Sequence, residues 1–162
     1  MGINWGRGPI DGVIINKLEK HLDKRGSLTE TFRIDELPNS LQPKMSYVSF
    51  TEPRVFRGPH EHKHQTDIFS FIGPGNFIIK LWDNRVKKKT YGNYMELFVG
   101  ADNPVTLIVP PGVVHGYKNI SKTEQAMAIN YPDHLYKGWG RQENVDEIRY
   151  EDLDEPDFKM ED

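Results

Sequence analysis

Residues 105–119 read VTLIVPPGVVHGYKN, which is a short apolar run, a turn and a second run rich in β-branched and aromatic residues. The first run is too short for a helix that crosses a core, and it stops at Pro110. Two prolines and a glycine then supply the backbone angles of a tight turn. The stretch therefore predicts two β-strands joined by a turn.

The same rhythm continues outward in both directions. Ten short runs of this kind are separated by turn signals such as Gly73-Pro74-Gly75-Asn76, and they cover residues 12–15, 28–32, 45–50, 55–60, 68–72, 77–82, 95–99, 105–109, 116–120 and 126–131. One helical turn is expected at residues 34–41, limited by Pro38. Ten short strands at this spacing indicate an all-β sandwich or barrel.

Composition narrows the functional classes. A chain of 162 residues suits one domain, residues 1–162. It has no cysteine, no signal-peptide pattern and no apolar run long enough to span a membrane, so we expect a cytoplasmic protein without a membrane partner. A net charge of −3 with interspersed signs argues against nucleic acid as a partner.

Histidines concentrate in residues 57–67, which read RGPHEHKHQTD. Alternate residues of a strand share a face, so His60, His62 and also His64 are expected to project together while Glu61 points away. Imidazoles on one face form a candidate metal site, although an exposed polar strand would show the same pattern. A fourth histidine, His115, follows the turn at residues 110–112.

Together these two stretches resemble the motifs of the cupins: a His-x-His pair, an acidic residue, and a later Pro-x-Gly-x-x-His segment. The resemblance implies a double-stranded β-helix (jelly-roll) barrel with a core at about residues 12–135 and a C-terminal extension at 136–162. In metal-binding cupins the matching positions close on one ion. Here they are His60, His62, Asp67 and His115, a donor set that suits Zn, Fe or Mn better than Mg²⁺ or Ca²⁺.

A closer resemblance, over residues 12–152, is to the dTDP-4-dehydrorhamnose 3,5-epimerases. It is carried in order by residues 23–30, by Arg57-Gly58-Pro59-His60, by the hairpin region at 83–103, by residues 111–116 and by Tyr131. It implies a homodimer that acts on a nucleotide-activated 4-keto-deoxysugar and requires no cofactor.

The same resemblance implies a role for each matched residue. His60 would remove a proton beside the ketone with support from Asp152, and Tyr131 would return one from the opposite face. The substrate-binding residues would be Arg25, Glu30, Arg57 and His115.

The chain departs from the family at two places. Gln65-Thr66-Asp67 replaces a segment that carries the lysine stabilising the enolate oxygen, and Met45 and Tyr47 replace a polar pair. A divalent ion bound at Asp67 would supply the lost positive charge, but His60 cannot be both its ligand and the free base. The alternatives are therefore a metal-dependent cupin, either a dioxygenase or a metal-assisted isomerase, and a non-catalytic sugar-binding cupin.

Overall fold

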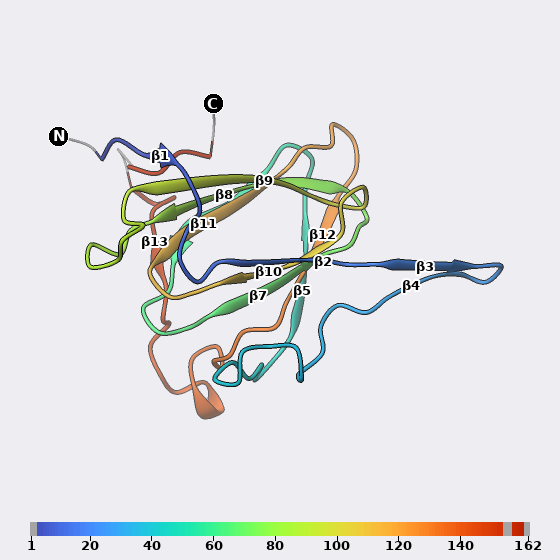
Figure 1. Cartoon of the computed structure of the whole chain (residues 1–162), viewed down its shortest axis with the longest axis horizontal. Helices are drawn as coiled ribbons and strands as arrows, with labels where there is room; N and C mark the ends of the chain where they lie inside the picture. The colour runs from blue at the N-terminus through green and yellow to red at the C-terminus, as the bar shows by residue number, and fades with distance from the viewer. Residues whose placement is uncertain (1–2, 154–156, 161–162) are drawn as a thin grey trace.

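Two facing β-sheets form the body of the protein in a computed structural model, which describes residues 3–153 and 157–160 (Figure 1). The six-stranded sheet has the order β1 (Gly6–Arg7), β9 (Asn93–Gly100), β8 (Asn76–Asp83), β11 (Val113–Asn119), β6 (Phe56–Glu61) and β13 (Ile148–Arg149). The five-stranded sheet has the order β2 (Ile14–Lys17), β10 (Val105–Val109), β7 (Asp67–Phe71), β12 (Ala126–Asn130) and β5 (Tyr47–Thr51). The predicted all-β jelly-roll class is confirmed.

Strand alternation builds the core between the sheets. On β7, Phe69 and Phe71 face inward, and Phe71 meets Phe77 edge to face at 5.4 Å between ring centroids. Tyr117 of β11 packs against the same rings, 5.2 Å from Phe77. Asp67 has the same parity on β7 as the two phenylalanines, so the strand that supplies core rings also carries a carboxylate inward.

Strands β6 and β11 approach closely beside the histidines. They are antiparallel neighbours, with His60 opposite His115 and a register irregularity between His115 and Tyr117. Gly58 has φ +80°, and a Cβ there would lie 2.6 Å from the His115 carbonyl oxygen. Only glycine fits both the backbone angle and this approach. The close contact brings two imidazoles together, with ring centroids 4.5 Å apart.

The predicted helical turn at residues 34–41 is wrong. Isolated turns take its place, with hydrogen bonds from Glu36 N to the Arg33 carbonyl and from Leu41 N to the Pro38 carbonyl. Pro38 has no N–H to continue a helix. The one helical element among the described residues is a 3₁₀ turn at Trp139–Arg141, so no described helix is long and apolar enough to cross a membrane.

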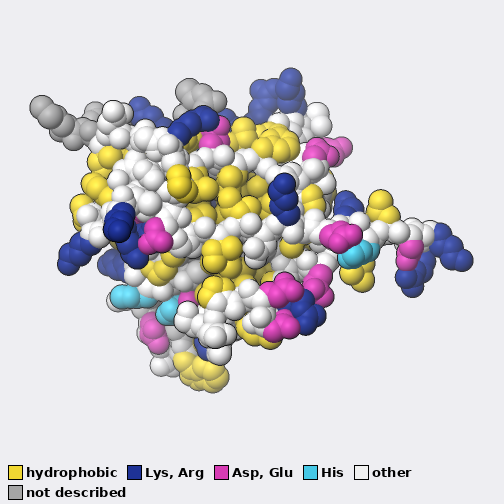
Figure 2. All heavy atoms as spheres, in the orientation of Figure 1, with side chains coloured by type: hydrophobic (Ala, Val, Ile, Leu, Met, Phe, Trp, Pro, Cys, Tyr) yellow, Lys and Arg dark blue, Asp and Glu magenta, His cyan; other side chains and the backbone are white. Residues whose placement is uncertain are grey.

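A two-stranded hairpin, β3 (Lys20–Asp23) and β4 (Gly26–Thr29), projects far from the body (Figure 1). Figure 2 shows basic side chains at its tip and hydrophobic ones along its length. Leu22 is 76% exposed and Leu28 is 66% exposed. The sequence rhythm predicted a strand at residues 28–32 but did not predict its partner β3.

Candidate active site

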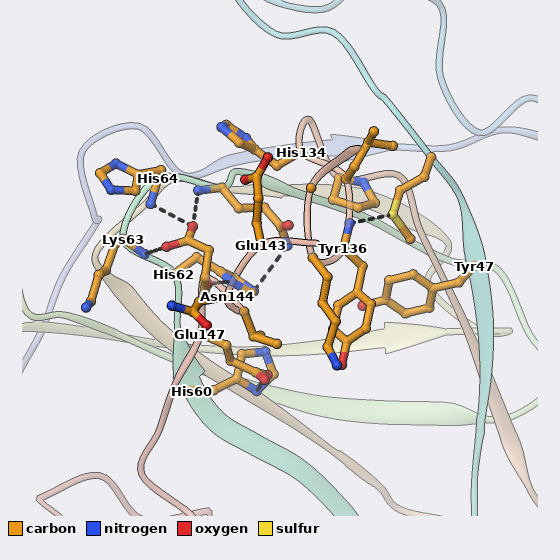
Figure 3. Close-up of a pocket in the computed structure, with 18 of the residues that line it drawn as sticks. Tyr47, His60, His62, Lys63, His64, His134, Tyr136, Glu143, Asn144 and Glu147 are labelled. Atoms are coloured by element: carbon orange, nitrogen blue, oxygen red, sulfur yellow. Dashed lines mark hydrogen bonds and ion pairs between the residues drawn. The ribbon is translucent and has the colours of Figure 1, made fainter. Parts of the chain in front are cut away.

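A cavity of about 1400 Å³ opens at one end of the barrel. Its walls come from both sheets and from the segment at residues 132–151, as Figure 3 shows. Five cationic side chains line it: Arg57, Lys63, Lys137, Arg141 and Arg149. Aromatic side chains, including Tyr47, Tyr136 and Trp139, line it as well. The cavity therefore combines positive charge with aromatic surface.

Asp67 lies close to this cavity at the start of β7 and is 1% exposed. Its Oδ1 accepts hydrogen bonds from Gln65 Nε2 at 2.8 Å and from Asn130 Nδ2 at 2.9 Å. Its Oδ2 lies 3.2 Å from His62 Nε2 and 3.2 Å from His115 Nε2. A buried carboxylate of this kind requires compensating donors or cations.

The two imidazoles beside Asp67 are oriented by the backbone. His62 Nδ1 faces the Asp146 carbonyl oxygen, and His115 Nδ1 lies 3.0 Å from the Val113 carbonyl oxygen. A carbonyl only accepts, so each Nδ1 carries hydrogen and each neutral ring would point the Nε2 lone pair at Asp67. Asp67 Oδ2 and His115 Nε2 are buried without a hydrogen-bond partner among the described residues. A cation, either a proton or a metal ion, is needed between these atoms.

Charge on the cluster favours a proton on His62 when no metal is bound. Burial disfavours the imidazolium form of His62. The hydrogen bond to Asp67 and the negative charge of Asp67 outweigh burial and raise the pKa of His62 to about 9. The same contacts from His115 and His62 hold the pKa of Asp67 well below its usual range despite burial of the carboxyl.

His60 has a different environment. Its Nδ1 faces a carboxylate, with Glu147 Oε1 at 3.8 Å, and Arg149 Nε holds the other oxygen of Glu147 at 2.8 Å. Figure 3 shows Glu147 beside His60 in the cavity. Burial, together with the neighbouring His115, lowers the pKa of His60 well below that of an ordinary histidine. His60 is therefore a neutral imidazole at neutral pH, which is the form that accepts a proton.

The segment that carries Glu147 is fastened to the end of β6. The Asp146 carboxylate accepts hydrogen bonds from the backbone N–H groups of Lys63, His64 and Gln65 at 3.2, 2.9 and 2.8 Å. The cavity wall and the histidine strand thus form one hydrogen-bonded unit.

The structure brings together five of the residues identified in the sequence: His60, His62, Asp67, His115 and Arg57. Arg57 lines the cavity and is held by β5 through the Thr51 hydroxyl at 3.1 Å and the Phe50 carbonyl at 2.9 Å. Glu61 points away, as alternation predicts, and its carboxylate accepts a hydrogen bond from Tyr150.

Three other predicted residues lie elsewhere, and a fourth lines the cavity without joining the imidazole cluster. Arg25 is at the tip of the projecting hairpin, bonded to Asp23, and Glu30 is exposed just beyond that hairpin. The carboxylate beside His60 is Glu147 rather than Asp152, which is exposed. His64, expected beside His60 and His62, lines the cavity but is exposed, because β6 ends at Glu61.

Tyr131 is also outside the cavity lining. Asn130 at the end of β12 points into the barrel, so the next side chain points outward. The Tyr131 hydroxyl lies 3.2 Å from Thr31 Oγ1, and its ring packs against Phe32 at 4.8 Å between centroids. Its proton-donor role is not supported by this position.

Three residues at the site were not identified from the sequence as functional: Glu147, Asp146 and Asn130. The first two stand in a tail with many acids, where nothing singles them out. Asn130 is the residue next to Tyr131. Identifying it would have required knowing which residues of β12 point into the barrel.

Comparison with known proteins gives consistent matches. A model of the family described as dTDP-4-dehydrorhamnose 3,5-epimerase matches residues 7–153. The spore coat polysaccharide biosynthesis protein SpsL of Bacillus subtilis (strain 168) is 37% identical over 116 residues, covering 70% of this chain and 74% of that protein.

Solved structures agree on the fold. A dTDP sugar isomerase from Desulfovibrio desulfuricans G20 has a TM-score of 0.73 and 25% identity, covering 86% of this chain and 84% of its own. An epimerase from Legionella pneumophila, solved with dTDP-4-keto-L-rhamnose, has a TM-score of 0.74 and 21% identity, covering 91% and 77%. The second likeness concerns the fold alone.

The His62–Asp67 pair predicts a pH-dependent stability in protein stripped of metal with EDTA. The folded-state pKa of His62 is raised, so its contribution is complete below the unfolded value near 6.5 and is lost as pH rises through about 9. We expect the free energy of unfolding to fall by at most about 3 kcal/mol between pH 6.5 and 9.5, measured by chemical denaturation. Asp67→Asn should flatten this slope, and an equal slope in that variant would contradict the assignment.

Proposed function

The chain belongs to the dTDP-4-dehydrorhamnose 3,5-epimerase family, and on that premise we propose that it epimerises the sugar of a nucleoside-diphosphate 4-keto-deoxysugar. The ketone acidifies the protons on its neighbouring carbons. A base removes one of them to form an enolate, and an acid returns a proton from the opposite face. The enzyme is an isomerase, and the position of His60 in the cavity is the observation that best supports the proposal.

His60 suits the role of base. A lowered pKa keeps it neutral, and with Nδ1 toward Glu147 its Nε2 is left to accept the carbon-bound proton. When His60 becomes charged, the negative Glu147 stabilises it at 3.8 Å, and Arg149 keeps that carboxylate in place. In this proposal Glu147 takes the supporting part that the family resemblance implied for Asp152.

The cavity also suits a nucleotide-activated sugar. Arg57 and the other lining cations can pair with a diphosphate, which a guanidinium binds through two parallel hydrogen bonds. Trp139 and Tyr136 provide aromatic surface for a nucleobase. The volume of about 1400 Å³ is large for a small-molecule site and leaves room for both halves of such a ligand.

We expect His60→Asn to reduce solvent deuterium exchange at the carbons beside the ketone at least about 100-fold, because the substitution removes the imidazole that accepts the proton. Exchange is measured by NMR or mass spectrometry with dTDP-, GDP- and UDP-linked 4-keto-deoxysugars. His64→Asn is the control, since His64 lines the same cavity but is exposed and lies outside the imidazole cluster.

Two results would contradict this proposal. One is wild-type protein that exchanges no deuterium with any of these substrates, which would favour the non-catalytic sugar-binding reading. The other is full exchange in His60→Asn. Oxygen uptake by iron-loaded protein on a small substrate would instead support the dioxygenase reading.

A metal-assisted form of the reaction is favoured by two buried atoms, Asp67 Oδ2 and His115 Nε2, which have no hydrogen-bond partner in the described part of the chain. The 3.2 Å separations of His62 and His115 Nε2 from Asp67 Oδ2 are close to the roughly 3.3 Å between ligand atoms around zinc with 2.0 Å bonds. Both rings donate Nδ1–H to a carbonyl, as metal-bound histidines do. These residues therefore fit a divalent ion such as Zn, Fe or Mn.

His60 also lies close to this centre. The ligand atoms of His60, His62 and Asp67 lie within 4.8 Å of one another, and the Glu147 carboxylate near His60 Nδ1 is a partner that metal-bound histidines also use. A histidine that binds the ion through one nitrogen is, however, no longer a free base. We propose that His62, Asp67 and His115 hold the ion and leave His60 free as base. A bound divalent ion would polarise the ketone, which is the task of the family lysine missing here.

We expect EDTA-treated wild-type protein to bind about one Zn²⁺ or Mn²⁺ per chain by isothermal titration calorimetry. Binding at 100 times the dissociation constant should stabilise the fold by about 2.7 kcal/mol. Asp67→Asn and His115→Gln should lose binding, while the exposed control His64→Gln keeps it. No binding by the wild type, or binding unchanged in Asp67→Asn, would exclude this centre and leave the proton on His62 as the cation.

We further infer that the protein is a homodimer that uses the β3–β4 hairpin. An isolated two-stranded hairpin is only marginally stable in water, and Leu22 and Leu28 project unburied from this one. A two-fold pair would bury both surfaces. The nucleotide-binding role implied for Arg25 and Glu30 then requires the cavity of the second protomer. Location in the cytoplasm stays a prediction from the sequence.

The double substitution Leu22→Glu and Leu28→Glu should convert the dimer to monomer in sedimentation or light-scattering measurements at micromolar concentration. Charged side chains on the hairpin oppose burial of its surface. Val86→Glu is the matched control, because Val86 is 74% exposed in the β8–β9 connection and away from the hairpin. Monomeric wild-type protein would refute the inference.

A further inference from the structure

Epimerisation needs a proton donor on the face of the sugar opposite His60, and the position of Tyr131 leaves that role open. Three other tyrosines line the cavity: Tyr47, Tyr117 and Tyr136. Tyr117 is on β11, in the same sheet as His60, and its hydroxyl is 3.1 Å from Ser49 Oγ. Tyr136 is on the exposed segment that follows β12.

Tyr47 is the first residue of β5, on the sheet that faces His60. Tyr47 and Ser49 share a face of that strand, and both line the cavity. Figure 3 shows the Tyr47 ring entering the cavity from the β5 side, while His60 enters from β6. A sugar between the sheets would thus have an imidazole on one face and a phenol on the other.

Asn130 determines which group is the donor in its hydrogen bond with the Tyr47 hydroxyl. Asn130 Oδ1 accepts from the Ile68 backbone N–H at 3.2 Å, so its amide nitrogen must point into the barrel. That nitrogen donates to Asp67 Oδ1 at 2.9 Å and to the Tyr47 oxygen at 2.8 Å. The phenol oxygen is therefore an acceptor in this bond, and its own hydrogen has no other protein acceptor among the described residues.

We propose that Tyr47, through its phenol O–H, is the acid that returns the proton to the enolate carbon. This inference rests on the proposed function. His60 Nε2 takes the carbon-bound proton and the C–H electron pair enters the enolate. That pair then takes the Tyr47 proton to form the new C–H bond, which leaves a phenolate. Water reprotonates the phenolate and removes the proton from His60, so the cycle closes without a co-reactant.

The surroundings of Tyr47 suit this task. Burial and the charge of Asp67 raise the pKa of Tyr47, so the phenol keeps its proton at neutral pH. The amide of Asn130 donates to the phenolate as it forms. Tyr47 also occupies one of the two positions where the chain departs from the family's polar pair.

The test separates exchange from inversion. We expect Tyr47→Phe to keep deuterium exchange at the substrate carbon within about threefold of wild type, because His60 still removes and returns a proton on its own face. Formation of the inverted sugar should fall at least about 100-fold. Tyr131→Phe is the matched control and should keep both activities.

The inference is overturned if Tyr47→Phe inverts the sugar at the wild-type rate, or if Tyr131→Phe, Tyr117→Phe or Tyr136→Phe shows exchange without inversion. Absence of exchange in the wild type would instead refute the proposed function. A second variant avoids any folding defect: 3-fluorotyrosine at position 47 keeps the hydroxyl and lowers the phenol pKa. In the pH–rate profile of inversion, the decline at high pH should move to lower pH, while the profile of exchange stays in place. An unchanged profile of inversion contradicts the proposal.

Discussion

The buried carboxylate of Asp67 is the constraint on which the arrangement of the site depends. It stands on β7 with the parity of the core residues Phe69 and Phe71, so the fold cannot turn it toward water without turning the core outward. A charge in that position has to be compensated. Groups on β11 and β12 and in the connection from β6 to β7 converge on it: His115, Asn130, His62 and Gln65. The backbone orients these groups: the Ile68 N–H fixes the Asn130 amide, and the carbonyls of Asp146 and Val113 fix the tautomers of the two histidines.

Short-range patterns predicted much of the fold and part of this site. The strand rhythm predicted the all-β class, and the period of two correctly separated His60 and His62 from Glu61. Parity also explains why Tyr131 lies outside the cavity lining, because Tyr131 and Asn130 are neighbours that face opposite sides of one sheet.

Local sequence patterns could not predict the remaining partners of the site, because these residues are far along the chain from the histidines that they contact. Glu147 meets His60 from 87 residues away, and Asp146 caps the segment at 63–65 from more than 80. No local period links these positions. The resemblance selected Asp152 in the same acid-rich tail, whereas the packing of the tail against β6 placed Glu147 at the imidazole.

The attachment of Asp146 has a mechanical consequence. One residue holds His62 Nδ1 through its carbonyl and the start of the 63–65 connection through its carboxylate, while its neighbours form the outer wall of the cavity. Displacing that wall to admit a bulky ligand would also release His62 from the acceptor that sets its tautomer. The outer wall of the cavity and the tautomer of His62 therefore depend on the same residue, so the wall cannot shift at Asp146 without changing the hydrogen bonding of the imidazole cluster.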